Sequence, residues 1–238
     1  MSPIPKVAVL TPAEMADVDR RQMQQQNEWR SSSGEPRTVR FLDFDLEIHS
    51  GVFPPKSDTE FLARNLKIDA GAKVADIGTG SGALAIHAAF LGAERVLAMD
   101  ISERALSNAR SNVEKHSLAR VIEVKKGDAL YQVHETERFD VIIANLPGRN
   151  KQSHDDVSAS QWDTDYRAHK ALFGNAKKHL APNGKVFMVK ANYPELLDLF
   201  QLVKHCGYVV SIVDVLPPTE TEMRSYHVLE ISATEGGV

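Results

Sequence analysis

Three glycines at alternate positions, Gly78, Gly80 and Gly82, directly follow a short apolar run at residues 73–77. Glycine has no Cβ, so a turn built from it accepts positive φ angles and lets the backbone approach a ligand closely. The pattern of residues 82–91 is helical, so the turn opens a helix whose free N–H groups face the same point. A strand, a glycine turn and a helix in this order predict an α/β domain that holds a nucleoside-bearing cofactor.

The rest of the chain alternates strand and helix patterns in the way that a doubly wound sheet requires. The last two expected strands have no helix between them, so they are predicted to pair as an antiparallel hairpin at the sheet edge. The predicted fold is a Rossmann-like, mostly parallel α/β sheet of seven strands. Residues 1–50 are predicted to form an extension of one helix and a β-hairpin, ahead of a main domain at residues 51–238. The expected strands lie at 73–77, 95–99, 121–125, 139–144, 184–190, 208–215 and 226–233, and the expected helices at 11–30, 58–67, 82–91, 102–115, 165–180 and 194–206.

Composition narrows the classes of partner. The 28 basic residues are interspersed with 32 acidic ones for a net charge of −4, which disfavours a nucleic-acid ligand. The single cysteine, Cys206, excludes an intramolecular disulfide. No apolar run reaches the ~18 residues that cross a bilayer, and the first residues lack signal-peptide features, so no membrane partner and a cytoplasmic location are expected. Oligomeric state is not indicated by the sequence.

An acid at the end of the first strand distinguishes between cofactors. Asp76 lies two residues before Gly78, where its charge would face the amino group of a zwitterionic ligand and repel a pyrophosphate. The dinucleotide pattern Gly-x-Gly-x-x-Gly would place its third glycine at Ala83, a position where that pattern sometimes accepts alanine. An NAD-dependent oxidoreductase and a non-catalytic cofactor-binding protein therefore remain as alternatives.

Polar residues also end the next three strands. Asp100 stands 22 residues after Gly78, where a carboxylate can accept both ribose hydroxyls. Asp128 can accept an exocyclic amine of adenine, and Ala129 offers a backbone N–H. The fourth strand ends at Asn145-Leu146-Pro147-Gly148. Because ligands bind across the carboxyl ends of an open parallel sheet, these side chains are expected at one rim.

The acid followed by Gly-x-Gly-x-Gly resembles the first motif of the class I S-adenosylmethionine-dependent methyltransferases, and the resemblance covers about residues 52–235. It implies S-adenosyl-L-methionine as the cofactor, with Asp76 through Gly82 at the methionine moiety, Asp100 at the ribose and Asp128 at the adenine. The candidates for cofactor contact are Thr59, Asp76, Gly78, Thr79, Gly80, Gly82, Asp100, Ile101, Asp128, Ala129 and Asn145.

Asn145-Leu146-Pro147-Gly148 resembles the Asn-Pro-Pro-Tyr motif of methyltransferases that modify nitrogen in planar groups. In such a motif the asparagine carbonyl and the next backbone carbonyl each accept one N–H of the target, and Asn145 and Leu146 keep that capacity. The aromatic position of the motif is Gly148, which removes a stacking platform worth about 1–3 kcal/mol per base in nucleic-acid sites. We therefore expect N-methylation of a small molecule or an amide or amine group, with protein glutamine as the second hypothesis and an RNA base as the third.

Two further segments bear on the acceptor. Residues 52–62 resemble the segment ahead of the first motif in the glutamine-methylating enzymes of translation release factors, which places Thr59 beside the cofactor and Phe53 over the ligands. Residues 148–164 are polar and without pattern, which predicts a structureless substrate lid whose acids would favour a cationic or amine-bearing substrate. These acids and His154 lack metal-ligand spacing, so no metal is expected. The candidate catalytic residues are Asn145, Leu146 and Pro147, and the candidate substrate-binding residues, which would shape specificity, are Phe53, Arg149, Trp162 and Tyr166.

Overall fold

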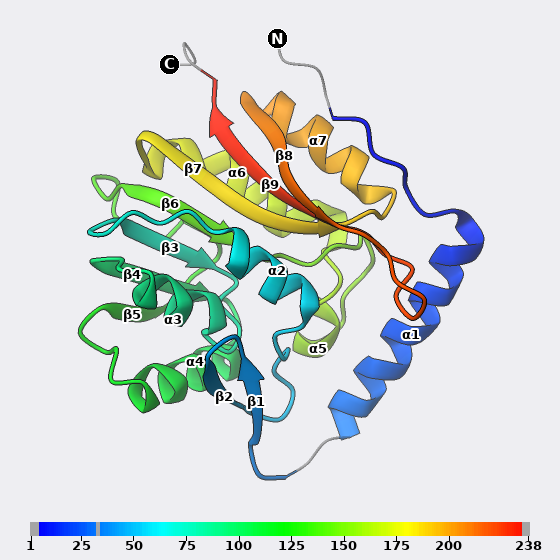
Figure 1. The fold of residues 1–238 in the computed structure, drawn as a ribbon, viewed down its shortest axis with the longest axis horizontal. Coiled ribbons are helices and arrows are strands. Elements are labelled where there is room, and N and C mark those ends of the chain that lie inside the picture. Colours follow the sequence, from blue (N-terminus) through cyan, green and yellow to red (C-terminus); the bar gives the residue numbers. More distant parts are fainter. Residues whose placement is uncertain (1–4, 32–33, 235–238) are drawn as a thin grey trace.

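A seven-stranded sheet with the order β5-β4-β3-β6-β7-β9-β8 forms the centre of the protein (Figure 1). A computed structural model describes residues 5–31 and 34–234. Residues 1–4, which belong to the start that lacks signal-peptide features, lie outside the described residues. Strands β3 to β7 run parallel, and β9 pairs antiparallel with both β7 and β8, which confirms the predicted Rossmann-like fold with its terminal hairpin. The strands of this sheet are β3 (Lys73–Ile77), β4 (Arg95–Asp100), β5 (Ile122–Lys126), β6 (Phe139–Ala144), β7 (Leu180–Ala191), β8 (Tyr208–Leu216) and β9 (Tyr226–Ala233).

Helices cover both faces of the sheet because its strands are apolar on both sides. Along β6, Val141 and Ile143 join the core under the first group of helices, and Ile142 and Ala144 join the core under the second. The first group is α2 (Ser57–Asn65), α3 (Ala83–Phe90) and α4 (Glu103–Lys115), and the second is α6 (Arg167–His179) and α7 (Glu195–His205).

A hairpin of β1 (Arg37–Phe41) and β2 (Phe44–Ile48) packs against α4. The side chains of Asn108 and Asn112 on α4 each bond the backbone of Glu47, and Leu46 is fully buried in the core under the first group of helices. The hairpin is therefore anchored to the sheet domain, and the predicted boundary between residues 50 and 51 stays a prediction.

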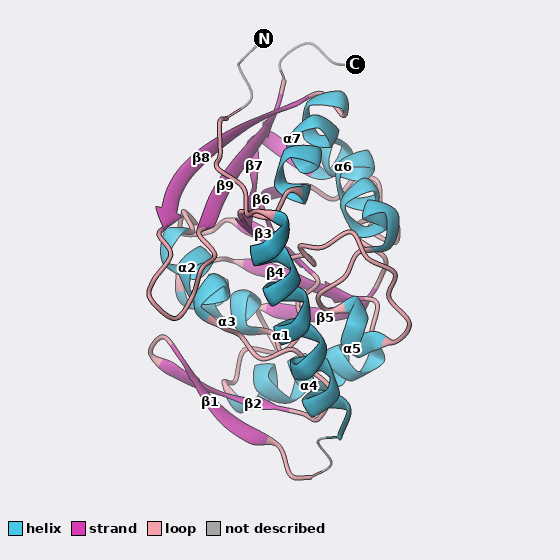
Figure 2. Ribbon diagram, turned by 90° about the vertical axis from the view of Figure 1, so that its right-hand side faces the viewer, coloured by secondary structure: helices cyan, strands magenta, loops and turns pink. Residues whose placement is uncertain are grey.

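Helix α1 (Pro12–Ser31) crosses the molecule in front of the carboxyl ends of the parallel strands (Figure 2). Its start is held by a reciprocal cap in which Thr11 N–H donates to Glu14 Oε2 at 2.7 Å and Glu14 N–H donates to Thr11 Oγ1 at 3.4 Å. Within the described residues, no helix combines the length and the apolar character that crossing a bilayer requires.

The prediction of a structureless segment at residues 148–164 is wrong. It contains the short helix α5 (Asp156–Ala159), and the 3₁₀ turn η1 (Thr164–Tyr166) follows. Asp155 and Ser158 cap α5 reciprocally, with Ser158 N–H donating to Asp155 Oδ1 at 2.8 Å. A helix of four residues has no apolar period, so only its capping pair marks it in the sequence.

Candidate active site

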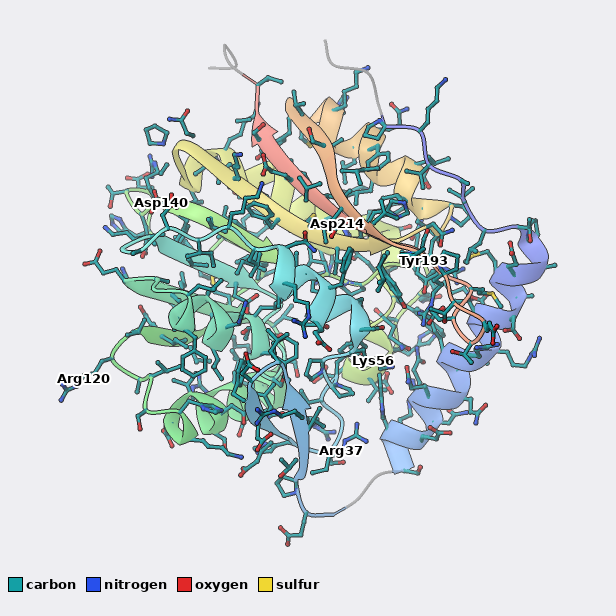
Figure 3. The ribbon with its side chains drawn as sticks, in the orientation of Figure 1. Arg37, Lys56, Arg120, Asp140, Tyr193 and Asp214 are labelled. Carbon is teal, nitrogen blue, oxygen red and sulfur yellow. The ribbon has the colours of Figure 1, made fainter. Side chains whose placement is uncertain are left out.

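A cavity of about 730 Å³ lies at the carboxyl ends of the central strands, within the usual size range of ligand pockets. Its wall is built by the turns after β3, β4 and β6, the end of β7, the start of α2, the segment around α5 and one side of α1. Strand β3 has β4 on one side and β6 on the other, so the cavity sits where the strand order reverses. Lys56 and Tyr193 mark this end of the sheet in Figure 3, whereas Asp140 and Arg120 mark the opposite end.

The glycine turn forms the floor of this cavity. The N–H groups of Gly78 and Thr79 donate to the Met99 carbonyl at 2.8 and 2.9 Å, which ties the turn to β4. Gly78, Gly80 and Gly82 have φ angles of 76°, 56° and 85°, the region that favours glycine. A Cβ on Gly80 would meet no atom closer than 4.0 Å, because the backbone there faces open space. Gly82 does not line the cavity; it caps α3, and a Cβ on it would lie 3.4 Å from Ala109 on α4.

Asp76 lies beneath the turn, outside the residues that line the cavity. Its Oδ2 accepts a hydrogen bond from Thr79 Oγ1 at 2.7 Å, and its Oδ1 has no hydrogen-bond partner among the described residues. Burial raises the pKa of Asp76 to about 7, with the charge of Asp100 adding to the effect. The geometry gives Asp76 a part in holding the turn, and its contact with a ligand amino group stays a prediction.

Asp100 and Asp128 both line the cavity at the ends of β4 and β5. Asp100 accepts from Gly80 N–H at 3.0 Å and from Ser102 N–H at 2.9 Å, which fixes its carboxylate toward the turn. Burial raises its pKa in spite of these bonds. Asp128 pairs with Arg167 at 2.5 Å near the surface. Ile101 also lines the cavity and is 53% exposed, an apolar side chain available to a flat ligand.

The turn after β6 presents Asn145, Leu146 and Pro147 on the cavity wall. Asn145 Nδ2 donates to Thr59 Oγ1 on α2 at 3.1 Å, so the two sequence motifs meet although 86 residues separate them. This bond leaves the Asn145 carbonyl oxygen facing away from Thr59 and able to accept. The Leu146 carbonyl, however, accepts from Lys190 Nζ at 2.5 Å, and the Pro147 carbonyl lies 3.4 Å from the same nitrogen.

Lys190, at the end of β7, was missed by the sequence reasoning. It is 5% exposed, lines the cavity, and forms no ion pair with the described carboxylates. Burial lowers its pKa to about 7, although the charges of Asp163 and Asp58 oppose the shift. The sequence could have indicated a buried lysine here, because Lys190 is the one charged residue among the otherwise apolar residues 186–191, all of which are buried in the structure.

The four residues expected to shape specificity fall into two pairs. Phe53 and Trp162 line the cavity, and Arg149 and Tyr166 do not. Arg149 is buried and pairs with Asp19 of α1 and, at 2.8 Å, with Glu195 of α7. Tyr166 donates its hydroxyl to Asp198 at 2.6 Å on the outside of the molecule.

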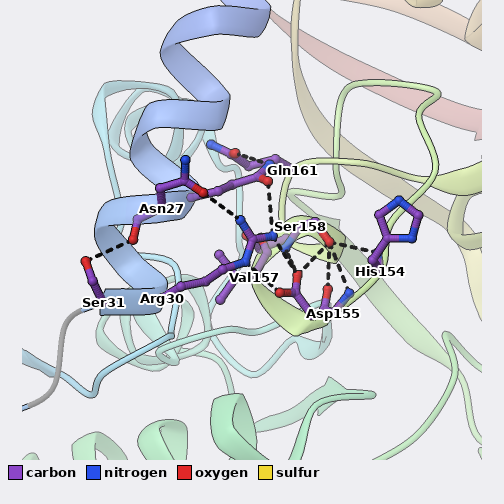
Figure 4. Close-up of polar contacts among 10 residues, drawn as sticks. Asn27, Arg30, Ser31, His154, Asp155, Val157, Ser158 and Gln161 are labelled. Carbon is purple, nitrogen blue, oxygen red and sulfur yellow. Dashed lines mark hydrogen bonds and ion pairs between the residues drawn. The ribbon is translucent and has the colours of Figure 1, made fainter.

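Glutamine side chains join α1 to the segment around α5, the second feature that the sequence reasoning missed. Trp162 Nε1 donates to Gln22 Oε1 at 3.1 Å, and Gln26 Nε2 donates to Gln161 Oε1 at 2.9 Å. Arg30 adds an ion pair with Asp155 at 2.7 Å at the end of α1 (Figure 4). The polar half of α1 therefore packs on the segment around α5, whereas its glutamine-rich sequence leaves open whether the helix lies on the surface or covers another part of the protein.

The acids of the predicted lid at residues 148–164 bond within the protein. Asp155 pairs with Arg30 and caps α5, and Asp156 accepts from Ser102 Oγ at 2.7 Å. Asp163 holds buried His169 through Nδ1 at 2.6 Å. These partners weaken the expectation that the lid acids select a cationic substrate. In the part of the chain that the structure describes, no group of three or more His, Cys, Asp or Glu side chains is placed to hold a metal ion.

The match to a family model decides the class of this site. Residues 43–211 match the model of the methyltransferase small domain. The chain belongs to this family. S-adenosylmethionine is the methyl donor that membership in this family implies, and the match does not support the NAD-dependent oxidoreductase or the non-catalytic alternative.

Two curated relatives are methyltransferases with protein substrates in their names. The ribosomal protein L11 methyltransferase of Desulforamulus reducens is 46% identical over 79 residues, covering 33% of this chain and 25% of its own. The release factor glutamine methyltransferase of Gloeobacter violaceus is 30% identical over 164 residues, covering 62% of this chain and 57% of its own. The chain thus spans between a quarter and somewhat more than half the length of these two relatives.

Solved structures agree on the fold. A ribosomal protein L11 methylase from Lactobacillus delbrueckii superposes with a TM-score of 0.58 at 24% identity, over 77% of this chain and 82% of that one. The tRNA m1G37 methyltransferase of M. jannaschii gives a TM-score of 0.60 at 17% identity, over 86% of this chain and 56% of that one. At such identities the likeness shows the class I methyltransferase fold alone.

The site fits the cofactor of this family. The open backbone at Gly80 leaves room for a ligand, and Asp100 keeps free lone pairs on both oxygens beside its two backbone bonds. The unpaired Oδ1 of Asp76 lies under the same turn. Residues at the ends of β3, β4 and β5 are therefore chemically suited to a methionine moiety, a ribose and a purine.

Proposed function

We propose that this methyltransferase methylates nitrogen in an amide or amine group of a small molecule or a short peptide-like substrate. One observation carries the proposal: Thr59 holds the Asn145 amide nitrogen at 3.1 Å, which directs the opposite oxygen of that amide to accept an N–H from the acceptor. Bound S-adenosylmethionine would supply a methyl group activated by a positively charged sulfur. The protein then has to position the acceptor and exclude water.

The cofactor side of the cavity follows from the strand ends. Asp100 would accept from the ribose hydroxyls, and Asp128 and Ala129 would hold the adenine edge. Gly78 and Gly80 would let the backbone approach the methionine moiety, while Asp76 supports the turn through Thr79. These roles require no change in the hydrogen bonds that the side chains already make.

On the acceptor side, Asn145 would orient the nitrogen, and the Leu146 carbonyl would accept with the lone pair that Lys190 leaves free. Lys190 lies beside both carbonyls, and its pKa of about 7 lets it take the proton that the acceptor loses near neutral pH. Phe53 and Trp162 would close the wall around the substrate.

The cover of the cavity favours an acceptor of limited size. We propose that the extension at residues 1–50 contributes α1 as this cover, because Gln22 and Gln25 line the cavity and bond the lid. A small molecule or a single extended side chain fits such an enclosure better than a structured surface.

A protein glutamine amide is the second candidate. The release factor glutamine methyltransferase of Gloeobacter violaceus aligns over 62% of this chain, and residues 52–62 carry the resemblance to that class. An RNA base is less favoured, because the net charge is −4.

A labelling experiment tests the proposal. The purified protein is supplied with methyl-labelled cofactor and, in parallel, with the metabolite, protein and RNA fractions of a cell extract, and the labelled product is identified by mass spectrometry. We expect label on nitrogen in the metabolite fraction. Label on glutamine in the protein fraction would establish the second candidate, and label on oxygen or carbon would refute N-methylation.

A further inference from the structure

Gly148 has no backbone reason to be glycine. It is absent from the residues with positive φ, so an ordinary side chain could occupy its conformation. A Cβ placed on it would instead lie 3.1 Å from Cε2 and 3.3 Å from Cδ2 of Tyr193. The ring of Tyr193 thus takes the space into which a side chain at residue 148 would extend, and the glycine makes room for it.

Tyr193 is held rigidly in this place. It is 4% exposed, and its hydroxyl accepts from Arg224 Nη1 at 3.1 Å. The guanidinium of Arg149 lies 5.2 Å from the ring centroid, and Glu195 fixes that guanidinium in turn. A side chain so constrained costs little entropy when a ligand packs on it.

Three other aromatic residues line the cavity, and each has contacts with other side chains. The guanidinium of Arg224 lies 5.3 Å from the ring centroid of Tyr226. Trp162 donates its indole N–H to Gln22 and packs under Lys151. Phe53 makes an edge contact with Trp29, with ring centroids 5.4 Å apart. Tyr193 both lines the cavity and lies against Gly148, in the turn of Asn145-Leu146-Pro147-Gly148.

We propose that Tyr193 replaces the aromatic residue missing at position 148 and forms the wall on which a planar acceptor packs. The inference rests on the proposed function, because it places the acceptor at Asn145. It defines the substrate class as a flat group, an amide conjugated to a ring or a heterocycle bearing N–H. The sequence suggests that the missing aromatic at Gly148 disfavours flat acceptors. The segment after β7 supplies a ring instead, so flat acceptors fit this site.

Binding of two matched probes tests this inference without methyl transfer. Benzamide and cyclohexanecarboxamide carry the same amide, but only benzamide is flat throughout, and each is titrated by NMR into protein saturated with S-adenosylhomocysteine. We expect the wild-type protein to bind benzamide the more tightly, and Tyr193→Leu to weaken benzamide about five- to tenfold while changing cyclohexanecarboxamide by less than about twofold. Tyr193→Phe, which keeps the ring, should bind benzamide as the wild type does.

Moving the aromatic ring from residue 193 to residue 148 separates the proposed role of the ring from a folding defect in Tyr193→Leu. Gly148→Tyr alone should destabilise the protein, because the two rings compete for one space, and Gly148→Tyr with Tyr193→Gly should recover both the thermal stability and the preference for benzamide. Equal losses of both probes in Tyr193→Leu, no rescue in the double variant, or no measurable benzamide binding to the wild type would overturn the proposal. Asn145→Ala separates the two hypotheses: if it leaves benzamide binding unchanged while Tyr193→Leu weakens it, the proposed function fails and the aromatic wall stands.

Discussion

The two halves of the cavity are built in different ways. On the cofactor side, the contacts described above join residues between 2 and 39 positions apart, as between Asp100 and Ser102 or between Asp128 and Arg167. On the acceptor side, contacts join distant segments: Asn145 meets Thr59 across 86 residues, and Arg149 meets Asp19 across 130. The cofactor half can therefore persist while the acceptor half changes, because its geometry depends on turns at the ends of neighbouring strands of one sheet.

This contrast has a functional consequence. A methyl donor common to the family needs a constant site, whereas an acceptor needs a site that differs between relatives. In this chain α1, the segment around α5 and the end of β7 meet over the acceptor half, and each comes from a separate part of the sequence. Variants that spare one half and damage the other provide the sharpest tests of the division.

The largest expected effect is on the acceptor side. Asn145→Ala should lower methyl transfer to the identified acceptor about 100-fold or more, since a misplaced acceptor costs rates of that order. Thr59→Val, which removes only the hydroxyl that orients Asn145, should lower it about tenfold. Calorimetric titration with S-adenosylhomocysteine should give affinities within about threefold of the wild type for both variants. A large loss of cofactor affinity in Asn145→Ala would break the proposed division of the cavity.

The complementary change is on the cofactor side. Asp100→Ala should weaken S-adenosylhomocysteine about 30-fold, because it removes a charged acceptor from two ribose hydroxyls. Asp128→Ala should weaken it less, about threefold to tenfold, since Asp128 lies nearer the surface and already pairs with Arg167. Asp69, exposed and outside the cavity wall, supplies the control variant Asp69→Ala, which should bind normally. Equal affinities for the Asp100 and Asp69 variants would contradict the role of Asp100.

The attachment of α1 gives the next effect. Arg149→Met leaves Asp19 and Glu195 without their shared partner and should lower the free energy of unfolding by about 2–4 kcal/mol. Limited proteolysis should then cut α1 sooner, with cofactor affinity retained. The matched control is Arg20→Met on α1. The Arg20 side chain is 74% exposed in its ion pair with Asp17, so this variant should change the free energy of unfolding by less than about 0.5 kcal/mol. Protection of α1 in Arg149→Met equal to that in the control would show that the buried pairs do not hold the cover.

The same division explains what the sequence could predict. The mostly parallel sheet of seven strands follows from alternating strand and helix patterns. The strands at 139–144 and 226–233 end where expected, because periodicity and turn residues are local signals. Asp100, Asp128 and the glycine turn reach the cavity for the same reason. Tyr193 could not be assigned, because its role depends on a contact with Gly148 in another segment. The ion pairs that hold Arg149 away from the cavity wall could not be predicted for a related reason, since its partners Asp19 and Glu195 lie in distant parts of the chain.

Lys190 gives an effect that is specific to pH. Its pKa is about 7 in the folded protein against 10.5 for the ordinary side chain, so between these values the unfolded chain binds more protons and the stability contributed by this group rises with pH. Below pH 7 the buried ammonium is charged in both states and its desolvation lowers stability in full; above pH 10.5 it is neutral in both and the cost vanishes.

Lys190→Met removes that cost. The difference in free energy of unfolding between the variant and the wild type should therefore fall by about 2–4 kcal/mol from pH 7 to pH 10. The groups facing Lys190 are Asp163 with His169, Asp58 on α2, and His227, its partner on β9; they remain in the variant, so their own titration cancels in the difference to first order. Lys185→Met on the same strand, with a side chain 42% exposed, should show no such slope. A Lys190→Met difference that is flat over this pH range would mean that the lysine stays charged beside the Leu146 carbonyl, and it would remove Lys190 as the group that takes the acceptor's proton.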